Sequence, residues 1–170
     1  FKNRPNGLRR DLAQAIADLK PSFMRFPGGC LAHGDGLDNI YNWKRTIGPV
    51  EQRLEDKNTW NYRQSFGLGY FEYFQFCEDI GAMPVPVVAA GVSCQNSART
   101  QGTGQECIPK EQMKGYIQDI LDLIEYANGP ATSTWGKKRA EAGHPEPFKL
   151  EYIGIGNEDK ITPGFQERFK

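Results

Sequence analysis

Three short apolar runs alternate with three amphipathic stretches along the chain, and this alternation limits the possible folds more than any other feature. Apolar residues recur at helical spacing in three stretches, residues 8–19, 68–80 and 110–127. The other apolar runs cover residues 22–26, 84–90 and 150–156, and their brevity favours strands. Strands that are joined through helices run parallel, with the helices covering the sheet. The sequence therefore predicts an α/β fold.

The long loops of this chain follow the predicted strands, whereas the turns before the strands are short. Both a (β/α)8 barrel and an open doubly wound sheet bind ligands at the carboxyl ends of their strands, so this asymmetry fits either fold. A complete barrel needs about 250 residues, and this chain has 170. If the fold is a barrel, residues 1–170 are a fragment of a single catalytic domain. Pro86 cannot donate a ladder hydrogen bond, so we expect it at a strand start or at an irregular edge.

The charge balance argues against two classes of partner. Basic and acidic residues number 21 each, so the net charge is zero and gives no electrostatic attraction to nucleic acid or to anionic lipid. No apolar run approaches the roughly 18 residues that span a bilayer. We therefore expect neither nucleic acid nor a membrane as a partner.

The cysteines and histidines do not form a metal-binding pattern. The sequence has no C-x-x-C pair and its two histidines lie far apart, so we expect no metal and no cofactor. Cys77 lies in an aromatic stretch and is predicted to be buried. Cys94 and Cys107 flank a polar loop, and a disulfide with Cα atoms within about 7 Å could close this loop if the protein is exported. Export to the periplasm or the medium is the location that we favour.

Asn157 and Glu158 directly follow the third predicted strand, in the segment Tyr152–Glu158. A carboxylate one step past a buried strand projects from its carboxyl end, here beside an amide that can hydrogen-bond a sugar hydroxyl. Taken alone, Asn157, Glu158 and Asp159 could equally cap the next helix, so this segment has two readings.

Arg25 and two glycines mark the end of the first predicted strand, in the segment Phe23–Cys30. An arginine is costly to bury in an apolar strand unless a carboxylate meets it, and Gly28 and Gly29 allow a sharp turn and a close approach to a ligand. Taken alone, the segment could be a tight turn beside an edge-strand arginine. It is a poor phosphate loop, because no Gly-Lys-Ser/Thr follows and no G-x-G-x-x-G is present.

Together with other motifs of the chain, these two segments are typical of one protein family. The motifs are Met24–Cys30, Asn42–Lys44 with Thr46–Val50, Gly67–Tyr70, Cys77–Asp79, Ile124–Pro130 and Gly156–Asp159. With them the chain resembles glycoside hydrolase family 51, the α-L-arabinofuranosidases, from about residue 7 to residue 160. The most specific parts are the strand that ends in Arg-Phe-Pro-Gly-Gly-Cys and the Asn-Gly-Pro that is followed later by Gly-Asn-Glu.

The resemblance implies a partial (β/α)8 barrel, covering about strands two to four, of a retaining glycoside hydrolase. It implies that Glu158 is the catalytic acid/base and that Asn157 binds the hydroxyl next to the anomeric carbon. It also implies that Arg25 lies under the site and orients the nucleophile, and that Gly29 and Cys30 line the arabinose subsite.

Retaining cleavage needs two carboxyl groups about 5–5.5 Å apart, one protonated to donate to the leaving oxygen and one ionised to attack. In the family the nucleophile is a glutamate near the end of strand seven, which would lie beyond Lys170. We therefore expect residues 1–170 alone to be inactive. His33 stands where many relatives carry an acidic residue, and this departure leaves the contacts of the leaving group open.

Four aromatic residues could stack on sugar rings or belong to the core: Trp43, which we favour for stacking, Trp60, Tyr62 and Trp135. His33 could be a polar contact in a subsite or an exposed loop residue, and His144 is expected to be structural. Asp35 and Asp38 could serve a metal or an inverting mechanism, but in a glycine-rich turn they are predicted to be turn formers.

The predicted function is the exo-acting removal of terminal α-L-arabinofuranosyl groups from plant polysaccharides or oligosaccharides. One alternative is another retaining barrel glycosidase, such as an endoglucanase or a xylosidase, and a second is a non-catalytic carbohydrate-binding barrel fragment. Glu158, Asn157 and Arg25 argue against the second alternative, because binding alone needs no buried acid. The predicted partner is an arabinose-containing oligo- or polysaccharide, and a homo-oligomer is compatible with the sequence.

Overall fold

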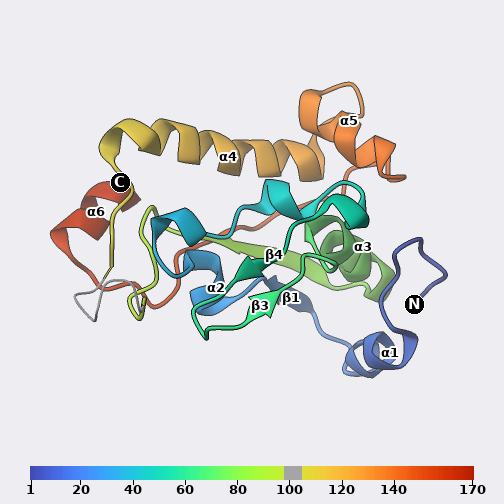
Figure 1. Cartoon of the computed structure of the whole chain (residues 1–170). Helices are drawn as coiled ribbons and strands as arrows, with labels where there is room; N and C mark the ends of the chain where they lie inside the picture. The colour runs from blue at the N-terminus through green and yellow to red at the C-terminus, as the bar shows by residue number, and fades with distance from the viewer. Residues whose placement is uncertain (98–104) are drawn as a thin grey trace.

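The computed structural model describes residues 1–97 and 105–170, which form an α/β fold around a parallel sheet (Figure 1). The sheet has the strand order β1 (Phe23–Phe26), β4 (Met83–Val88), β5 (Gly154–Ile155). Its main helices are α1 (Arg10–Asp18), α3 (Tyr70–Ile80) and α4 (Lys110–Asn128). In Figure 1, α4 runs along one side of the sheet and α1 lies on the other. The predicted α/β class is confirmed.

Shorter elements fill the connections. After β1 come α2 (Gly29–His33), the 3-10 helices η1 (Leu37–Asn39), η2 (Trp43–Thr46) and η3 (Val50–Gln52), and an antiparallel hairpin of β2 (Asp56–Lys57) and β3 (Arg63–Gln64). After α4 comes α5 (Thr134–Glu141), and after β5 comes α6 (Pro163–Phe169).

The strand pairings along β4 are offset. β1 pairs with the first part of β4, from Phe23 opposite Met83 to Phe26 opposite Pro86. β5 pairs only with the last two residues of β4, Val87 and Val88. Pro86 therefore lies inside the central strand, and its predicted place at a strand start or an edge is wrong. The ladder to β5 begins after Pro86, so the proline is not required to donate to that neighbour.

The third strand is shorter than the apolar run 150–156 predicts. The backbone N–H of Leu150 donates to Oδ1 of Asn128, and Nδ2 of Asn128 donates to the Leu150 carbonyl oxygen, both at 2.8 Å. The backbone N–H of Phe148 likewise donates to Ala127, at 2.8 Å. Because this backbone bonds to the end of α4, ladder pairing to β4 begins only at Gly154.

Helix α5 lies outside the three stretches in which the sequence predicts helices. The hydroxyl of Ser133 accepts a hydrogen bond from the backbone N–H of Gly136 and so caps its first turn. Arg139 is fully buried and donates to the carbonyl oxygens of Tyr126 and Gly129, both at 2.7 Å, at the end of α4. Orphan carbonyls of α4 are thereby satisfied by a side chain of α5, which ties the two helices together.

The core lies between α3, α4 and the sheet. Nearly the whole length of α3 is buried, including Tyr70, Phe74 and Cys77, and it packs against Leu123 and Tyr126 of α4. Cys77 is buried as predicted, and burial raises the pKa of its thiol to about 12. The sheet thus packs against α3, which is buried from Tyr70 to Cys77.

Candidate active site at the strand ends

The carboxyl ends of β1 and β5 bring two predicted site residues into contact. Nη2 of Arg25 donates a hydrogen bond to Oδ1 of Asn157 at 2.6 Å, although 132 positions separate them in the chain. Gly29 packs against the same amide, since a Cβ at this position would lie 3.3 Å from Nδ2 of Asn157. Cys30 follows in α2 and is half-buried. The turn after β1 and the turn after β5 therefore form one surface.

The turn after β5 holds Glu158 in an uncommon conformation. The backbone N–H of Gly156 donates to the carbonyl of Val88 at 2.7 Å, and Gly156 has a φ of 84°. A side chain at Gly156 would meet Oδ2 of Asp159 at 2.2 Å, so the turn requires glycine here. Glu158 has a φ of 51°, in the left-handed region that non-glycine residues rarely adopt.

Glu158 is exposed in the structure, and its Oε2 lies 3.5 Å from Nδ2 of Asn157. An accessible carboxyl group beside an amide can exchange a proton with a bound molecule while the amide bonds a neighbouring hydroxyl. Arg25 is also exposed, and its partner is the amide of Asn157. The arginine is thus neither buried nor met by a carboxylate within the described part of the chain.

A buried His–Asp pair lies next to this turn, and no local sequence pattern indicates it. His33, the last residue of α2, is fully buried, so its reading as an exposed loop residue is wrong. Its Nε2 lies 3.4 Å from Oδ1 of Asp159, whose side chain is 7% exposed. Burial lowers the pKa of His33, and the nearby Asp159 opposes this shift. Burial likewise raises the pKa of Asp159, and His33 opposes it.

Trp43 does not offer a stacking surface for a sugar. Its side chain is 4% exposed, and the rings of Tyr70, Tyr126 and Trp135 surround it with centroids 5.0 to 6.4 Å away. Its Nε1 donates to the carbonyl of Asp119 at 2.7 Å. The predicted stacking role of Trp43 is wrong, because further protein around it could only bury the ring more. Trp60 and Tyr62 are exposed, and their stacking role stays a prediction.

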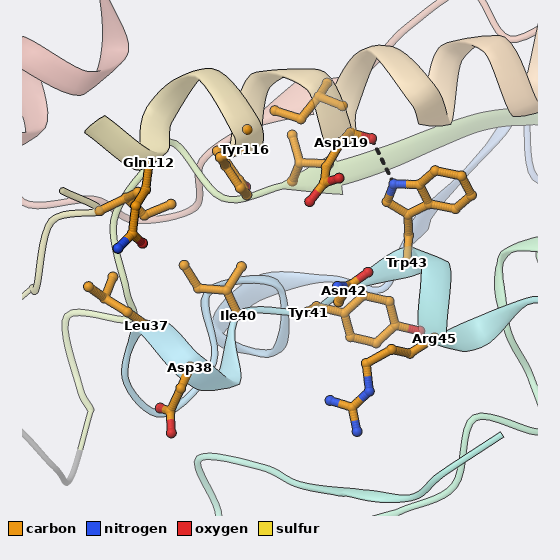
Figure 2. A pocket seen from close by; sticks show the side chains of 14 residues that line it. Leu37, Asp38, Ile40, Tyr41, Asn42, Trp43, Arg45, Gln112, Tyr116 and Asp119 are labelled. Atoms are coloured by element: carbon orange, nitrogen blue, oxygen red, sulfur yellow. Dashed lines mark hydrogen bonds between the residues drawn. The ribbon is translucent and has the colours of Figure 1, made fainter. Parts of the chain in front are cut away.

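A cavity of about 330 Å³ lies between residues 37–45 and helix α4 (Figure 2). Tyr116 and Asp119 reach it from α4, and Tyr41 reaches it from the opposite wall. Of the described residues around it, none is Arg25 or Glu158. Val88, the last residue of β4, also lines this hollow, so it lies beside the carboxyl end of the central strand.

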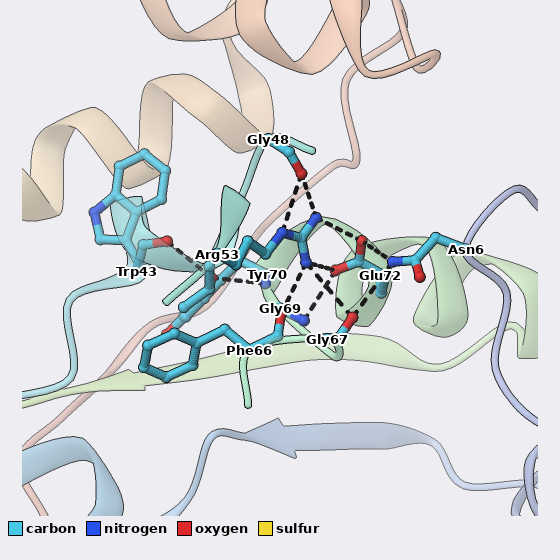
Figure 3. Close-up of polar contacts among 10 residues, drawn as sticks. Asn6, Trp43, Gly48, Arg53, Phe66, Gly67, Gly69, Tyr70 and Glu72 are labelled. Atoms are coloured by element: carbon cyan, nitrogen blue, oxygen red, sulfur yellow. Dashed lines mark hydrogen bonds and ion pairs between the residues drawn. The ribbon is translucent and has the colours of Figure 1, made fainter. Parts of the chain in front are cut away.

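A second polar cluster fixes the long segment after β1 onto α3 (Figure 3). Arg53 and Glu72 form an ion pair at 2.8 Å, and each side chain is 4% exposed. Arg53 also donates to the carbonyls of Gly48, at 2.7 Å, and Phe66, at 2.9 Å. Glu72 accepts from the backbone N–H of Gly69 at 2.9 Å, at the start of α3. The cluster has a structural role, and the sequence reading missed it.

The structure has no disulfide between Cys94 and Cys107, because both are free cysteines. The ends of this loop pair through the backbone instead, since Ser93 donates to Glu106 at 2.9 Å and an isolated bridge joins Val92 to Cys107. The predicted disulfide is thus wrong. Burial raises the pKa of Cys94 to about 11. The middle of the loop, residues 98–104, lies outside the described residues.

Other predicted residues have structural surroundings. The ring of His144 stacks on Phe148 at 4.0 Å, and its Nε2 lies 2.9 Å from Oε2 of Glu78. Asp35 accepts a hydrogen bond from Ser97 at 2.8 Å. Across residues 1–97 and 105–170, no three potential ligand side chains gather as a metal site would require. No helix of the described chain is long and apolar enough to cross a membrane.

Comparison with known proteins gives a consistent result. A family model described as the alpha-L-arabinofuranosidase 1 domain matches residues 15–170. An extracellular exo-alpha-L-arabinofuranosidase of Streptomyces chartreusis is 50% identical over 100% of this chain and 21% of its own length. Alpha-L-arabinofuranosidase 1 of Arabidopsis thaliana is 44% identical over 92% of this chain and 22% of its own length. The chain thus spans about a fifth of the length of these relatives.

Solved structures agree with the sequence relatives. An arabinose-bound family 51 α-L-arabinofuranosidase superposes with a TM-score of 0.85 at 39% identity, over 99% of this chain and 26% of that chain. The arabinose complex of the Thermotoga maritima α-L-arabinofuranosidase gives a TM-score of 0.67 at 28% identity, over 90% of this chain and 26% of that chain. Because the family model covers well over half of its residues, the chain belongs to the alpha-L-arabinofuranosidase 1 domain family.

Proposed function

We propose that this chain supplies the acid/base side of a retaining α-L-arabinofuranosidase. The observation that carries the proposal is the contact of Arg25 with Asn157, next to Glu158, at the carboxyl ends of parallel strands. Enzymes of the (β/α)8 class build their sites from this end of the sheet. Glu158 would protonate the leaving oxygen and then activate water, as the acid/base of a retaining enzyme does.

The sheet would form part of a (β/α)8 barrel, with β1, β4 and β5 as about its second to fourth strands. Residues 1–170 would then belong to a single catalytic domain. The parallel pairing and the helical connections support this assignment. Asn157 would bind the hydroxyl next to the anomeric carbon, and Gly29 and Cys30 would line the arabinose subsite. Arg25 would orient the nucleophile, a glutamate from another part of the barrel.

The substrate would be an oligo- or polysaccharide with terminal α-L-arabinofuranosyl groups. The Streptomyces relative is named as an exo-acting extracellular arabinofuranosidase, and arabinose is bound in a similar solved structure. On the same grounds we propose that the protein is exported. Assembly into a homo-oligomer stays a prediction.

The test is the leaving-group dependence of Glu158→Ala in the full-length enzyme. An activated 4-nitrophenyl leaving group needs little proton donation, whereas an unactivated phenyl or sugar leaving group needs much. We expect kcat/KM to fall by about 10²–10⁴ on the phenyl arabinofuranoside, and far less on the 4-nitrophenyl one. Glu151→Ala is a matched control, because Glu151 is another exposed glutamate of the segment that leads into β5. Equal losses on both substrates would refute the acid/base role.

A further inference from the structure

The buried pair of His33 and Asp159 has a place in the fold that links the two halves of the site. His33 ends α2, the helix that starts with Gly29 and Cys30. Asp159 is the residue after Glu158. The distance from Nε2 of His33 to Oδ1 of Asp159 is 3.4 Å. The pair therefore connects the turn after β1 to the turn after β5 on their buried side.

The two oxygens of Asp159 have different surroundings. Oδ2 accepts the backbone N–H of Asn157 at 3.0 Å, and this bond folds the turn around Glu158. Oδ1 has no hydrogen-bond partner among the described residues, and neither ring nitrogen of His33 has one either. A buried polar atom without a partner costs about 1–3 kcal/mol. Nε2 of His33 and Oδ1 of Asp159 are buried and face each other. A proton between these two atoms would give each of them a hydrogen-bond partner.

We propose that His33 and Asp159 are a positioning pair, in which one proton bridges Nε2 of His33 and Oδ1 of Asp159 and so holds the Asn157–Glu158 turn against α2. The pair does not touch the substrate, and it acts through Glu158. The inference rests on the proposed acid/base role of Glu158.

The charges around the pair fit a shared proton rather than two separate ions. Burial is the main influence on the pKa of both groups, and it disfavours the charged form of each. Arg25 on β1 also lowers the pKa of His33. Tyr116 of α4 is a further titratable group that interacts with Asp159. A proton held between the two atoms satisfies both without a second counter-ion.

The expected effect follows from geometry. Glu158 is held with a φ of 51° by the fold of its turn, so the loss of the pair would let the turn relax. A displacement of about 1 Å at a reacting group can cost about 10²-fold in rate. We therefore expect a loss of kcat/KM that grows with the proton donation that the leaving group needs.

The experiment uses the full-length enzyme with the phenyl and 4-nitrophenyl arabinofuranosides. His33→Met keeps the volume and removes the donor, and we expect it to lower kcat/KM by about 10–100-fold on the phenyl substrate and by less than about threefold on the other. His33→Gln restores an N–H donor and should recover most of the loss. If His33→Met does not fold, His33→Leu gives the same readout, because it also removes the ring nitrogen and leaves the bond from the N–H of Asn157 to Asp159 in place.

Equal losses of His33→Met on both substrates, or no recovery with His33→Gln, would overturn the positioning role and indicate a packing role alone. Glu158→Ala, assayed in parallel, separates the two proposals. If Glu158→Ala lacks the leaving-group dependence, both the proposed acid/base role and the positioning role of the pair are refuted. If Glu158→Ala has the dependence and the His33 variants do not, only the positioning pair is refuted.

Discussion

Arg53→Met in the full-length protein should cause a large loss of stability. Both members of the Arg53–Glu72 pair are 4% exposed, so solvent screens their attraction little. The substitution removes the partner of the Gly48 and Phe66 carbonyls and leaves a buried carboxylate with only neutral donors. Removal of one member of such a pair costs about 3–5 kcal/mol. A cost of 1 kcal/mol shifts Tm by about 2–4 °C in a domain of 150–250 residues and by less in a larger protein, so Tm should fall by at most roughly 20 °C.

The assay is thermal unfolding at one fixed scan rate, with Arg63→Met as the control. Arg63 lies in the same long segment and pairs with Glu55, but the two side chains are 69% and 54% exposed. An exposed pair contributes at most about 1 kcal/mol, so this control should stay near the parent. The double variant Arg53→Met/Glu72→Leu should be more stable than Arg53→Met, since no buried charge remains. A Tm for Arg53→Met close to that of the control would refute the reasoning.

Two further predictions concern titration and thiols. The pKa of Asp122 is lowered, because hydrogen bonds from Lys44 and Gln118 outweigh the burial that would raise it. The stabilisation by this carboxylate is present above its ordinary value of 3.8 and lost as pH falls through the lowered one. Asp122→Asn should thus cost about 1–3 kcal/mol in denaturant unfolding at pH 7 and progressively less as pH falls below 3.8, and an equal cost at pH 7 and pH 3 would contradict this. Non-reducing alkylation after denaturation should label Cys30, Cys77, Cys94 and Cys107, and mass spectrometry that finds a Cys94–Cys107 bridge would contradict the structure.

The sequence predicted those helices and strands in which the spacing of apolar residues marks the buried face. Helices α1, α3 and α4 lie within two residues of the predicted ranges at each end. The buried face of each element repeats at fixed spacing, and this repeat can be read without knowing the neighbours. Arg25, Gly29, Asn157 and Glu158 lie together because parallel strands end at the same edge.

The rest depended on contacts between distant parts of the chain. The apolar run 150–156 reads as a full strand, but Asn128, over 20 positions earlier, takes the backbone bonds of Leu150. Trp43 has polar neighbours in the sequence, which suggest an aromatic residue in an exposed loop. In the structure, three rings from other segments surround it. Asp159 reads as a capping residue, and only the fold reveals that His33 faces it. No local pattern marks such partners.

The offset pairing along β4 has a consequence for how the sheet could continue. β1 meets the first part of β4 and β5 meets its last two residues, so β5 is displaced toward the carboxyl end relative to β1. Displacements in one direction accumulate from strand to strand, and a sheet that closes into a cylinder needs such shear together with a tilt of its strands. Strands added with the same slope would curve the sheet toward closure, whereas strands added in level register would leave it an open ribbon.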